Sequence, residues 1–140
     1  MRAERLRSAT GSALLLMPAA VLIVVVLGGI AVDRAVVFGA QRDLVATAQA
    51  AANDAASEGV DLRALRSGGD VAVARDRIDI AVARAVALAD GTVRARWALQ
   101  DDVLVVRLER TVDLVFSGGV PGASDRQVVR ATARSRLLRR

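Results

Sequence analysis

The chain has 140 residues, of which 54% are hydrophobic, 25% are charged and only 2% are aromatic, and its net charge is +5. A chain of this length supplies one folded domain at most, since domains usually take roughly 100 to 200 residues. It contains no cysteine and no histidine. Disulfide scaffolds, thiolate enzymes, histidine-based general bases and the usual zinc sites are therefore excluded.

The positive charge is concentrated at the two ends of the chain. Residues 1–12 hold three arginines and one glutamate, and residues 125–140 hold six arginines and one aspartate. Acidic residues outnumber basic ones in the stretch between them. The middle of the chain is therefore not a basic domain.

An uncharged segment follows the basic N-terminus. No charged residue occurs from Ser8 to Val32, and Ala13–Val32, here called the apolar run, is interrupted only by Pro18, Gly28 and Gly29. Its 20 residues, at ~1.5 Å each, are long enough to cross the ~30 Å hydrocarbon core of a bilayer. Proline and glycine are compatible with a membrane helix, and the arginines before the run place the N-terminus in the cytoplasm.

Three interpretations of the apolar run compete. The first is an uncleaved single-pass anchor. The second is a cleavable signal peptide, for which Gly29-Ile30-Ala31 offers the small residues of a cleavage site. The third is a core helix of a soluble protein. The anchor is favoured, because the run exceeds the ~7 to 15 residues of a signal-peptide core and the helical pattern continues after it.

Apolar and small residues recur at steps of three and four beyond the run, which predicts one helix from about Ala13 to Ser57. Such a helix is roughly 65 Å long, so about half of it stands outside the membrane. Its outer stripe, suited to close packing against a helix or a sheet, comprises Val37, Ala40, Leu44, Ala48, Ala51 and Ala55. Composition and helix propensity alone would account for these alanines equally well.

The following pattern predicts a loop, a short helix and a strand. Gly59 is a typical helix stop, and glycines and serine indicate a loop over 59–70. A second helix is expected over about 73–89. The period then changes to two, which predicts a strand over 93–100 with Trp97 facing the core.

Two more strands complete the pattern. Gln100-Asp101-Asp102 indicates a turn, and a strand is expected over 103–116. Its inward face comprises Leu104, Val106, Leu108, Val112, Leu114 and Phe116. Residues 117–124 indicate a loop, and 126–137 alternate again, with Val129, Ala131, Ala133 and Leu137 facing inward.

The fold class expected from these elements is α+β. A long N-terminal membrane-spanning helix, a second short helix and a three-stranded antiparallel β meander follow one another, as in a pseudopilin-like protein. The expected divisions are a cytoplasmic basic N-terminus (1–12), a transmembrane helix (13–32), its extracytoplasmic continuation (33–58) and a small α+β domain (59–140). A soluble part of this size is marginally stable alone, so we expect it to pack against a partner.

No group of residues indicates catalysis. Asp101 and Asp102 suit a turn, and neither Ser67-Gly68-Gly69 nor Ser117-Gly118-Gly119 continues into a phosphate-binding motif. The Arg-rich end, 126–140, lacks the aromatic residues that stack on bases. We therefore expect no enzyme, no cofactor, no metal and no nucleic acid; attraction to anionic envelope polymers or lipid head groups stays open.

Several fragments around the apolar run carry a resemblance to a known family. Gly11-Ser12-Ala13 leads into the run, which closes on Ala31-Val32-Asp33-Arg34, and Gln41-Arg42-Asp43-Leu44 and the alanine-rich 50–56 follow. In this order they resemble the TadE/TadG-like family of tight-adherence (Flp) pilus assembly proteins, in the short form found in actinobacteria. The resemblance covers about residues 8–57.

The resemblance implies a bitopic, pseudopilin-like accessory protein of a pilus or a related secretion apparatus. TadE-like members have a glycine before the apolar run and a glutamate five residues later, for prepilin-peptidase processing and subunit docking. Gly11 matches the glycine, but Leu16 stands at the position of the glutamate. The TadG-like, unprocessed side of the family therefore fits better.

We thus expect a non-enzymatic, single-pass component of the cell membrane with an extracytoplasmic C-terminal domain. Its expected partners are the lipid bilayer and other pilin-like or pilus assembly membrane proteins, in a homo- or hetero-oligomer whose outer helices pack together. Helix packing within the bilayer is expected at the small residues Ala13, Ala19, Ala20, Gly28, Gly29 and Ala31. The alternative is a secreted or anchored envelope binding module whose apolar segment is an export signal.

Overall fold

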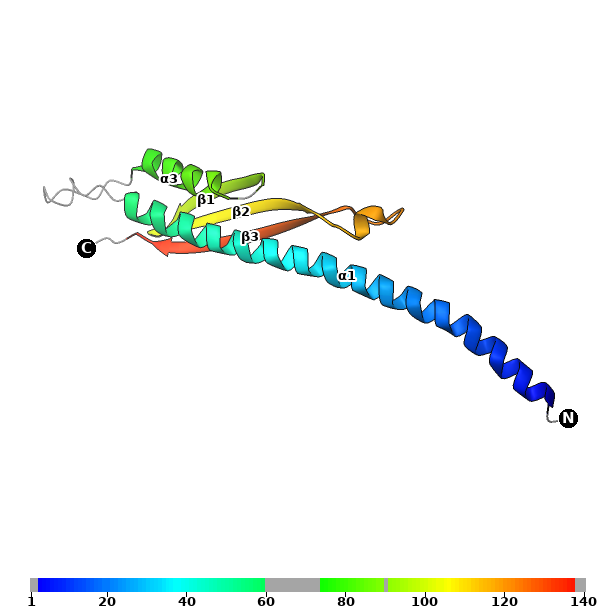
Figure 1. Ribbon diagram of the computed structural model, residues 1–140. Coiled ribbons are helices and arrows are strands. Elements are labelled where there is room, and N and C mark those ends of the chain that lie inside the picture. The colour runs from blue at the N-terminus through cyan, green and yellow to red at the C-terminus, as the bar shows by residue number, and fades with distance from the viewer. Residues whose placement is uncertain (1–2, 60–73, 90, 138–140) are drawn as a thin grey trace, which may run out of the picture.

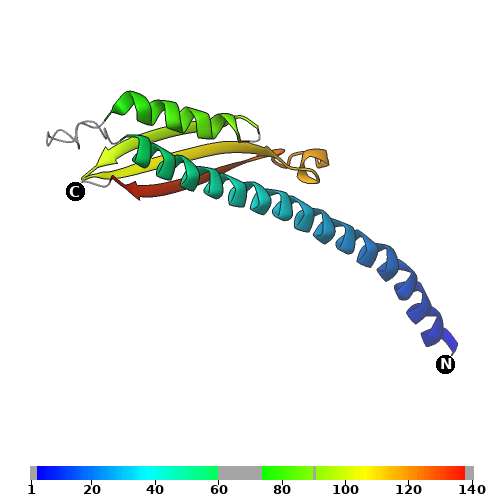
Figure 2. The same ribbon diagram turned by 60° about the vertical axis from the view of Figure 1, so that its left-hand side comes forward.

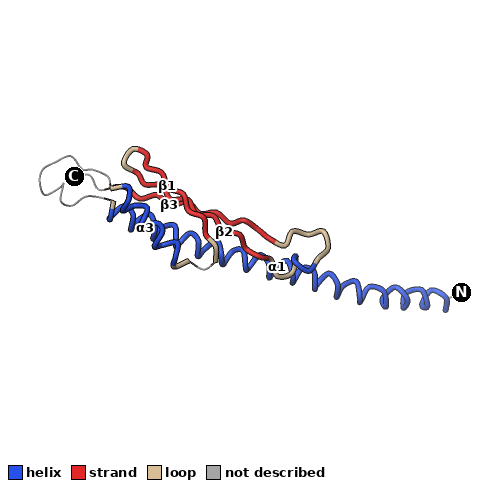
Figure 3. Tube along the Cα trace, turned by 90° about the horizontal axis from the view of Figure 1, so that it is seen from above, coloured by secondary structure: helices blue, strands red, loops and turns tan. Residues whose placement is uncertain are grey.

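The computed structural model describes residues 3–59, 74–89 and 91–137, with side chains of the first helix described from Leu16 onward. In chain order the elements are α1 (Ala3–Glu58), α3 (Arg75–Ala87), β1 (Val93–Gln100), β2 (Val103–Asp113), a short 3-10 turn η1 (Ser117–Gly119) and β3 (Arg126–Arg136). The strands form one antiparallel sheet in the order β1-β2-β3, and both helices lie on one face of it (Figures 1 and 3). The predicted α+β architecture is confirmed.

α1 is one helix with two environments. Its N-terminal part projects away from the rest of the protein, and its C-terminal part lies along the sheet (Figure 2). From Leu16 to Val32 the side chains are exposed and only Gly29 is partly covered. From Asp33 to Gly59 one face of the helix is buried. The helix and its apolar segment are long enough to cross a membrane.

The two ends of α1 differ in how well the sequence predicted them. The helix begins at Ala3 rather than near Ala13, because the hydrophobic pattern marks only the start of the apolar run, while the alanines, arginines and glutamate before it are good helix formers. At its other end α1 stops at Glu58, directly before Gly59 as predicted, and the amide of Gly59 donates to the carbonyl of Ala55 (2.9 Å). The rest of the expected loop, 60–70, lies outside the described residues.

α3 is shorter than the predicted helix over 73–89. It spans Arg75–Ala87 and ends where the chain turns at Leu88. Ile78 and Val82, about one turn apart on α3, are buried. α3 lies beside α1 and reaches over β1 (Figure 1).

β1 and its turn follow the predicted pattern. Residues of β1 alternate between partly buried and exposed along the whole strand. Trp97 packs against the core, and its indole Nε1 donates to Oδ1 of Asp79 on α3 (2.6 Å). Asp101 and Asp102 both have positive φ angles, 46° and 64°, which is the conformation of a two-residue type I′ hairpin turn. The turn predicted at this position is confirmed.

β2 ends earlier than predicted. The strand stops at Asp113, and the amide of Leu114 donates to the carbonyl of Asp125 (2.7 Å) as the chain turns away from the sheet. Their spacing predicted that Leu114 and Phe116 belong to the inward face of the strand. This prediction is wrong, because the strand ends before them. The recurrence of apolar residues at every second position continues in the sequence beyond the end of the strand. There Phe116 is apolar because it packs on α1, not on the core of the sheet.

The core lies between the two helices and the inner face of the sheet. Its largest fully buried side chains are Leu44 of α1, Ile78 of α3 and Leu104, Val106 and Leu108 of β2. On β3 the predicted inward residues Val129, Ala131, Ala133 and the following Leu137 are buried. The outer stripe of α1 faces this sheet: Ala40, Leu44, Ala48, Ala51 and Ala55 are buried, and Val37 is partly buried. Alanine leaves little side chain between helix and sheet, so α1 lies close against the strands.

Candidate functional site

The loop between β2 and β3 connects the sheet to the exposed segment of α1. It contains η1 and lies beside the helix at the point where α1 leaves the sheet (Figure 1). Four residues make the connection, and we call them the junction: Gly29 and Asp33 of α1, about one turn apart, and Phe116 and Ser117 of the loop.

Asp33 is the centre of the junction. It is only 6% exposed, and its Oδ1 accepts a hydrogen bond from the amide of Phe116 (2.8 Å). Its Oδ2 accepts two more, from the amide (2.8 Å) and the hydroxyl (2.6 Å) of Ser117. Burial of a carboxylate is unfavourable unless the group is paired or hydrogen-bonded. The loop supplies the donors that Asp33 needs, so the two segments depend on each other.

The same hydrogen bonds determine the protonation state of Asp33. The hydroxyl of Ser117 and then the amide of Phe116 hold the pKa of the carboxyl below its ordinary value of 3.8, and partial desolvation opposes them. Hydrogen bonds to the ionised form favour that form. Asp33 is therefore an acceptor at neutral pH, which suits it to fastening the loop rather than to donating a proton.

Gly29 permits the second contact of the junction. A Cβ atom at this position would overlap the aromatic ring of Phe116, whereas a Cβ at Gly28 would meet nothing within 4 Å. The ring therefore lies directly against the backbone of α1, and only glycine leaves room for it. Gly29 was predicted to pack against another membrane helix, but in this structure the chain's own loop covers it.

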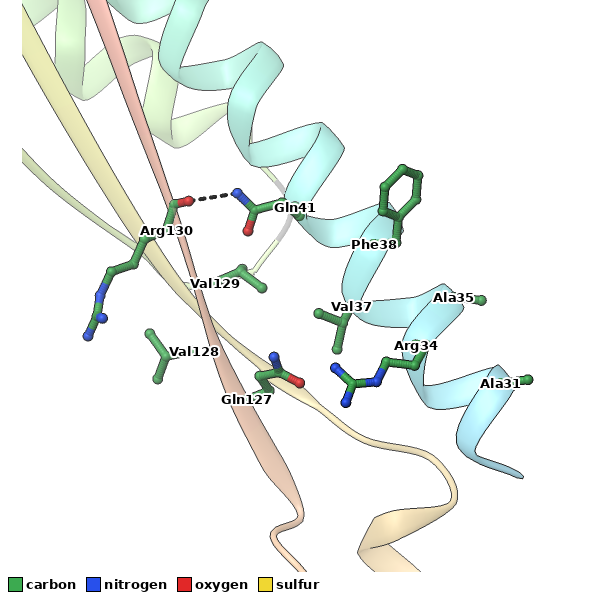
Figure 4. Close-up of a pocket in the computed structure, with 10 residues that line it drawn as sticks. All are labelled: Ala31, Arg34, Ala35, Val37, Phe38, Gln41, Gln127, Val128, Val129 and Arg130. Atoms are coloured by element: carbon green, nitrogen blue, oxygen red, sulfur yellow. Dashed lines mark hydrogen bonds between the residues drawn. The ribbon is translucent and has the colours of Figure 1, made fainter. Parts of the chain in front are cut away.

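An open groove of about 750 Å³ lies between α1 and the edge strand β3 (Figure 4). Gln41 Nε2 donates to the carbonyl of Arg130 (2.7 Å) and so satisfies a group on the edge of the sheet. Val37 and Val129 lie between helix and strand, whereas Phe38 points away from β3 and is 72% exposed. The groove is lined by apolar side chains together with glutamines and arginines.

The outer face of the sheet is rich in arginine. Arg94 and Arg130 lie opposite Glu109 on either side. The hydrogen bond from Arg130 (2.9 Å), with smaller contributions from nearby arginines, holds the pKa of Glu109 below its ordinary value of 4.5. Arg96 lies directly opposite Arg107, and like charges in this position are destabilising. On this part of the face four arginines surround a single glutamate, so the face has a net positive charge.

The predicted basic C-terminal strand matches β3. Arg130, Arg134 and Arg136 are exposed and alternate with buried or partly buried residues, in agreement with a solvated strand face. Residues 138–140 lie outside the described part of the chain.

The structure separates the two predicted sets of packing residues. Ala19, Ala20, Gly28 and Ala31 lie on the exposed segment of α1, and Ala13 lies among the side chains that are not described. The outer stripe, in contrast, is brought together into the core. This stripe, predicted to pack closely against a helix or a sheet, packs against the chain's own sheet and α3.

Sequence reasoning did not bring Asp33, Phe116 and Ser117 together. The pattern assigns Asp33 only the role of the first charge after the apolar run, and it assigns Phe116 to a strand. One signal was present: residues 114–124 carry no charge between Asp113 and Asp125. A loop without charged side chains is suited to a position beside an apolar helix, but the sequence does not pair the two segments.

Among the described side chains, those of residues 16–59, 74–89 and 91–137, no group of three or more acidic, cysteine or histidine residues is arranged to hold a metal ion. The hydrogen bonds and the ring contact at the junction hold the β2–β3 loop against α1. Comparison with models of known protein families, with curated proteins and with solved structures finds no match for this chain.

Proposed function

We propose that this chain is a membrane-anchored, pseudopilin-like accessory component of a Flp/tight-adherence pilus or a related secretion apparatus, with a structural role. The observation that carries the proposal is the division of α1. One helix combines an apolar segment with exposed side chains, Leu16–Val32, and a segment that is the central support of the folded head. The head is defined here as α1 from Asp33 onward together with α3 and the sheet.

The exposed segment supports a single-pass anchor. Most of its large side chains, among them Met17, Val24 and Leu27, are more than half exposed, which is unfavourable in water and favourable in a bilayer. The basic residues before the segment favour an N-terminus in the cytoplasm and a head on the outer side. The resemblance of residues 8–57 to TadE/TadG-like proteins supports the more specific assignment to a pilus or secretion apparatus.

The junction supports an anchor over an export signal. Cleavage after Ala31 would leave only Val32 before Asp33 and would remove Gly29 from its contact with Phe116. The mature chain would then lose part of a contact that the fold builds. A retained helix keeps the whole junction intact.

The surface for a partner is a flank of α1 that the head does not cover. Phe38 is 72% and Val45 is 49% exposed on the outer half of the helix, and the small residues Ala20 and Ala31 are exposed within the apolar run. We propose that this flank contacts the helix of another pilin-like subunit. Small residues allow close helix packing in the bilayer, and Phe38 supplies a large apolar contact above it.

Two experiments test the proposal. Mass spectrometry of the mature protein should find an N-terminus near residue 1; a start near Val32 would support the export-signal alternative, and a start at Ser12 would indicate pilin-type processing. Copurification from membranes in mild detergent should recover a pilin-like membrane protein with the chain. Phe38→Asp should weaken this recovery, whereas Ala50→Asp, at an exposed position about a third of a turn around the same helix from this flank, should not. Recovery of a lone monomer, with unchanged piliation after deletion, would contradict the proposal.

The arginine-rich outer face of the sheet favours the second candidate, an envelope binding module. Arginine forms strong paired hydrogen bonds with carboxylate and phosphate groups, so an anionic polymer is the matching ligand. Retention of the purified chain on dextran sulfate but not on neutral dextran, lost in Arg96→Gln/Arg107→Gln, would support this candidate. Equal behaviour on the two matrices would exclude it.

A further inference from the structure

The loop between β2 and β3 has a composition that is unusual for an exposed connection. The eleven residues from Leu114 to Ser124 contain no charged side chain, although Asp113 and Asp125 flank them directly. Val115 is 68% exposed and Val120 is 42% exposed. Loops that contact only water are normally polar. These side chains are therefore suited to a less polar environment.

The position of the loop identifies this environment. Phe116 contacts Gly29, which lies three residues before the end of the apolar run at Val32. Three residues of helix correspond to ~4.5 Å along its axis. The loop also extends beyond the sheet toward the N-terminal part of α1, at the opposite end from the β1–β2 turn (Figure 1). A bilayer that encloses the apolar run up to Val32 meets this loop first.

Charged residues mark a boundary on the helix and on the strands. Asp33 and Arg34 are the first charges after the apolar run. Asp113 and Arg126 form an ion pair at the base of the loop (3.2 Å). The helix carries no charged side chain from Ser8 to Val32, and the loop carries none from Leu114 to Ser124. Both segments thus change from charged to apolar on the same side of the molecule.

We propose that the β2–β3 loop is a second membrane contact, in which Val115, Phe116 and Val120 lie in the interfacial region of the bilayer beside the anchoring helix. The inference rests on the anchor of the proposed function. The three hydrogen bonds to Asp33 hold the loop at a fixed height on the helix. Apolar groups that lie in the interface reach ~5 to 10 Å into it, which is compatible with a contact one turn below Asp33. Two attachments, the helix and the loop, then fix the tilt of the head on the membrane.

The absence of cysteine from the chain allows a direct test. Val115→Cys and Val120→Cys are each labelled with an environment-sensitive thiol fluorophore in the full chain, which is reconstituted in vesicles of phosphatidylcholine and phosphatidylglycerol. Thr132→Cys, exposed on the outer face of the sheet, is the aqueous control, and Leu22→Cys, exposed on the apolar run, is the membrane control. Quenching is measured with nitroxide-labelled lipids and with aqueous iodide.

The expected result is that labels at Val115 and Val120 are quenched by the lipid nitroxide and are severalfold less sensitive to iodide than the label at Thr132. If Leu22 is quenched by lipid but both loop labels behave like Thr132, the loop inference fails and the anchor stands. If Leu22 also escapes the lipid quencher, the anchor itself fails. Loop labels protected from iodide but unaffected by lipid would indicate a second copy of the chain over the loop, and would overturn the inference as well.

The labelled positions do not endanger the fold. Val115 and Val120 are exposed, and their side chains make no hydrogen bond within the junction. Near-ultraviolet circular dichroism of Trp97, on β1, verifies the head in every variant before reconstitution. A loop label that reports water in a correctly folded head therefore counts against the inference.

Discussion

The aromatic ring of Phe116 lies against the backbone of Gly29, so a loop of the sheet directly contacts the apolar part of α1. Asp33, about one turn along the helix, accepts hydrogen bonds from the same loop. The hydrogen bonds to Asp33 join residues 83 and 84 positions apart in the chain. They attach the β2–β3 loop of the head to the end of the exposed segment of α1.

Substitution of Gly29 by alanine should destabilise the head. The added Cβ overlaps the ring of Phe116, and overpacking of this kind typically costs about 1 to 3 kcal/mol. Gly28→Ala is the matched control, because it adds the same methyl group to open space and gains helix propensity. Urea unfolding of the detergent-solubilised chain, followed by Trp97 fluorescence, measures both. Equal stability of the two variants would contradict the contact.

Asp33→Asn should lower the thermal midpoint of the head by several degrees. The amide can no longer accept all three hydrogen bonds, because its NH2 group faces a backbone or hydroxyl donor. Asp43→Asn, at an exposed position on the same helix, removes the same charge and should leave the midpoint unchanged. The junction would lose its assigned importance if both variants melted alike.

Stability should fall with acidification. The pKa values of Asp33 and Glu109 are lowered in the folded state from ordinary values of 3.8 and 4.5. The unfolded chain therefore binds more protons, so the stabilisation is present above about pH 5 and is lost as the pH falls through the folded pKa values. Melting curves between neutral pH and pH 3 measure this slope. It should be smaller in Asp33→Asn than in the wild type or in Asp43→Asn.

Ala51→Leu should destabilise the packing of α1 on the sheet. Ala51 is fully buried, and the larger side chain forces helix and strands apart, at a typical cost of about 1 to 3 kcal/mol. Ala50→Leu makes the same change on the exposed side and should have little effect. Chemical unfolding of both variants compares the two faces; a tolerated leucine at Ala51 would mean that α1 does not lie on this sheet.

Arg107→Gln should stabilise the head slightly. It removes the like-charge pair with Arg96 across β1 and β2, and cross-strand pairs contribute about 0.2 to 1 kcal/mol. Arg134→Gln is the control, because Arg134 lies opposite the uncharged Val105. The gain should shrink at high salt, where exposed charges are screened. Identical melting of the two variants at low salt would show that the repulsion is negligible.

Much of the fold was predictable because its signals are local. The period of two marked β1 and β3, the step of three to four residues marked α1, and Asp101-Asp102 marked a tight turn. The end of β2 was not predictable, because the alternation of Leu114 and Phe116 continues after the strand has left the sheet. Periodicity records which side chains are apolar, and it does not record whether a sheet or a helix covers them.

By itself, the sequence determined that a long apolar helix begins the chain and that a short helix and a three-stranded meander follow it. Only the tertiary structure decided what covers each apolar surface. The outer stripe of α1 is covered by the chain's own sheet, and Gly29 is covered by Phe116. The reason is physical: secondary structure follows from interactions between near neighbours, whereas the burial of Asp33 requires donors from a loop far along the chain.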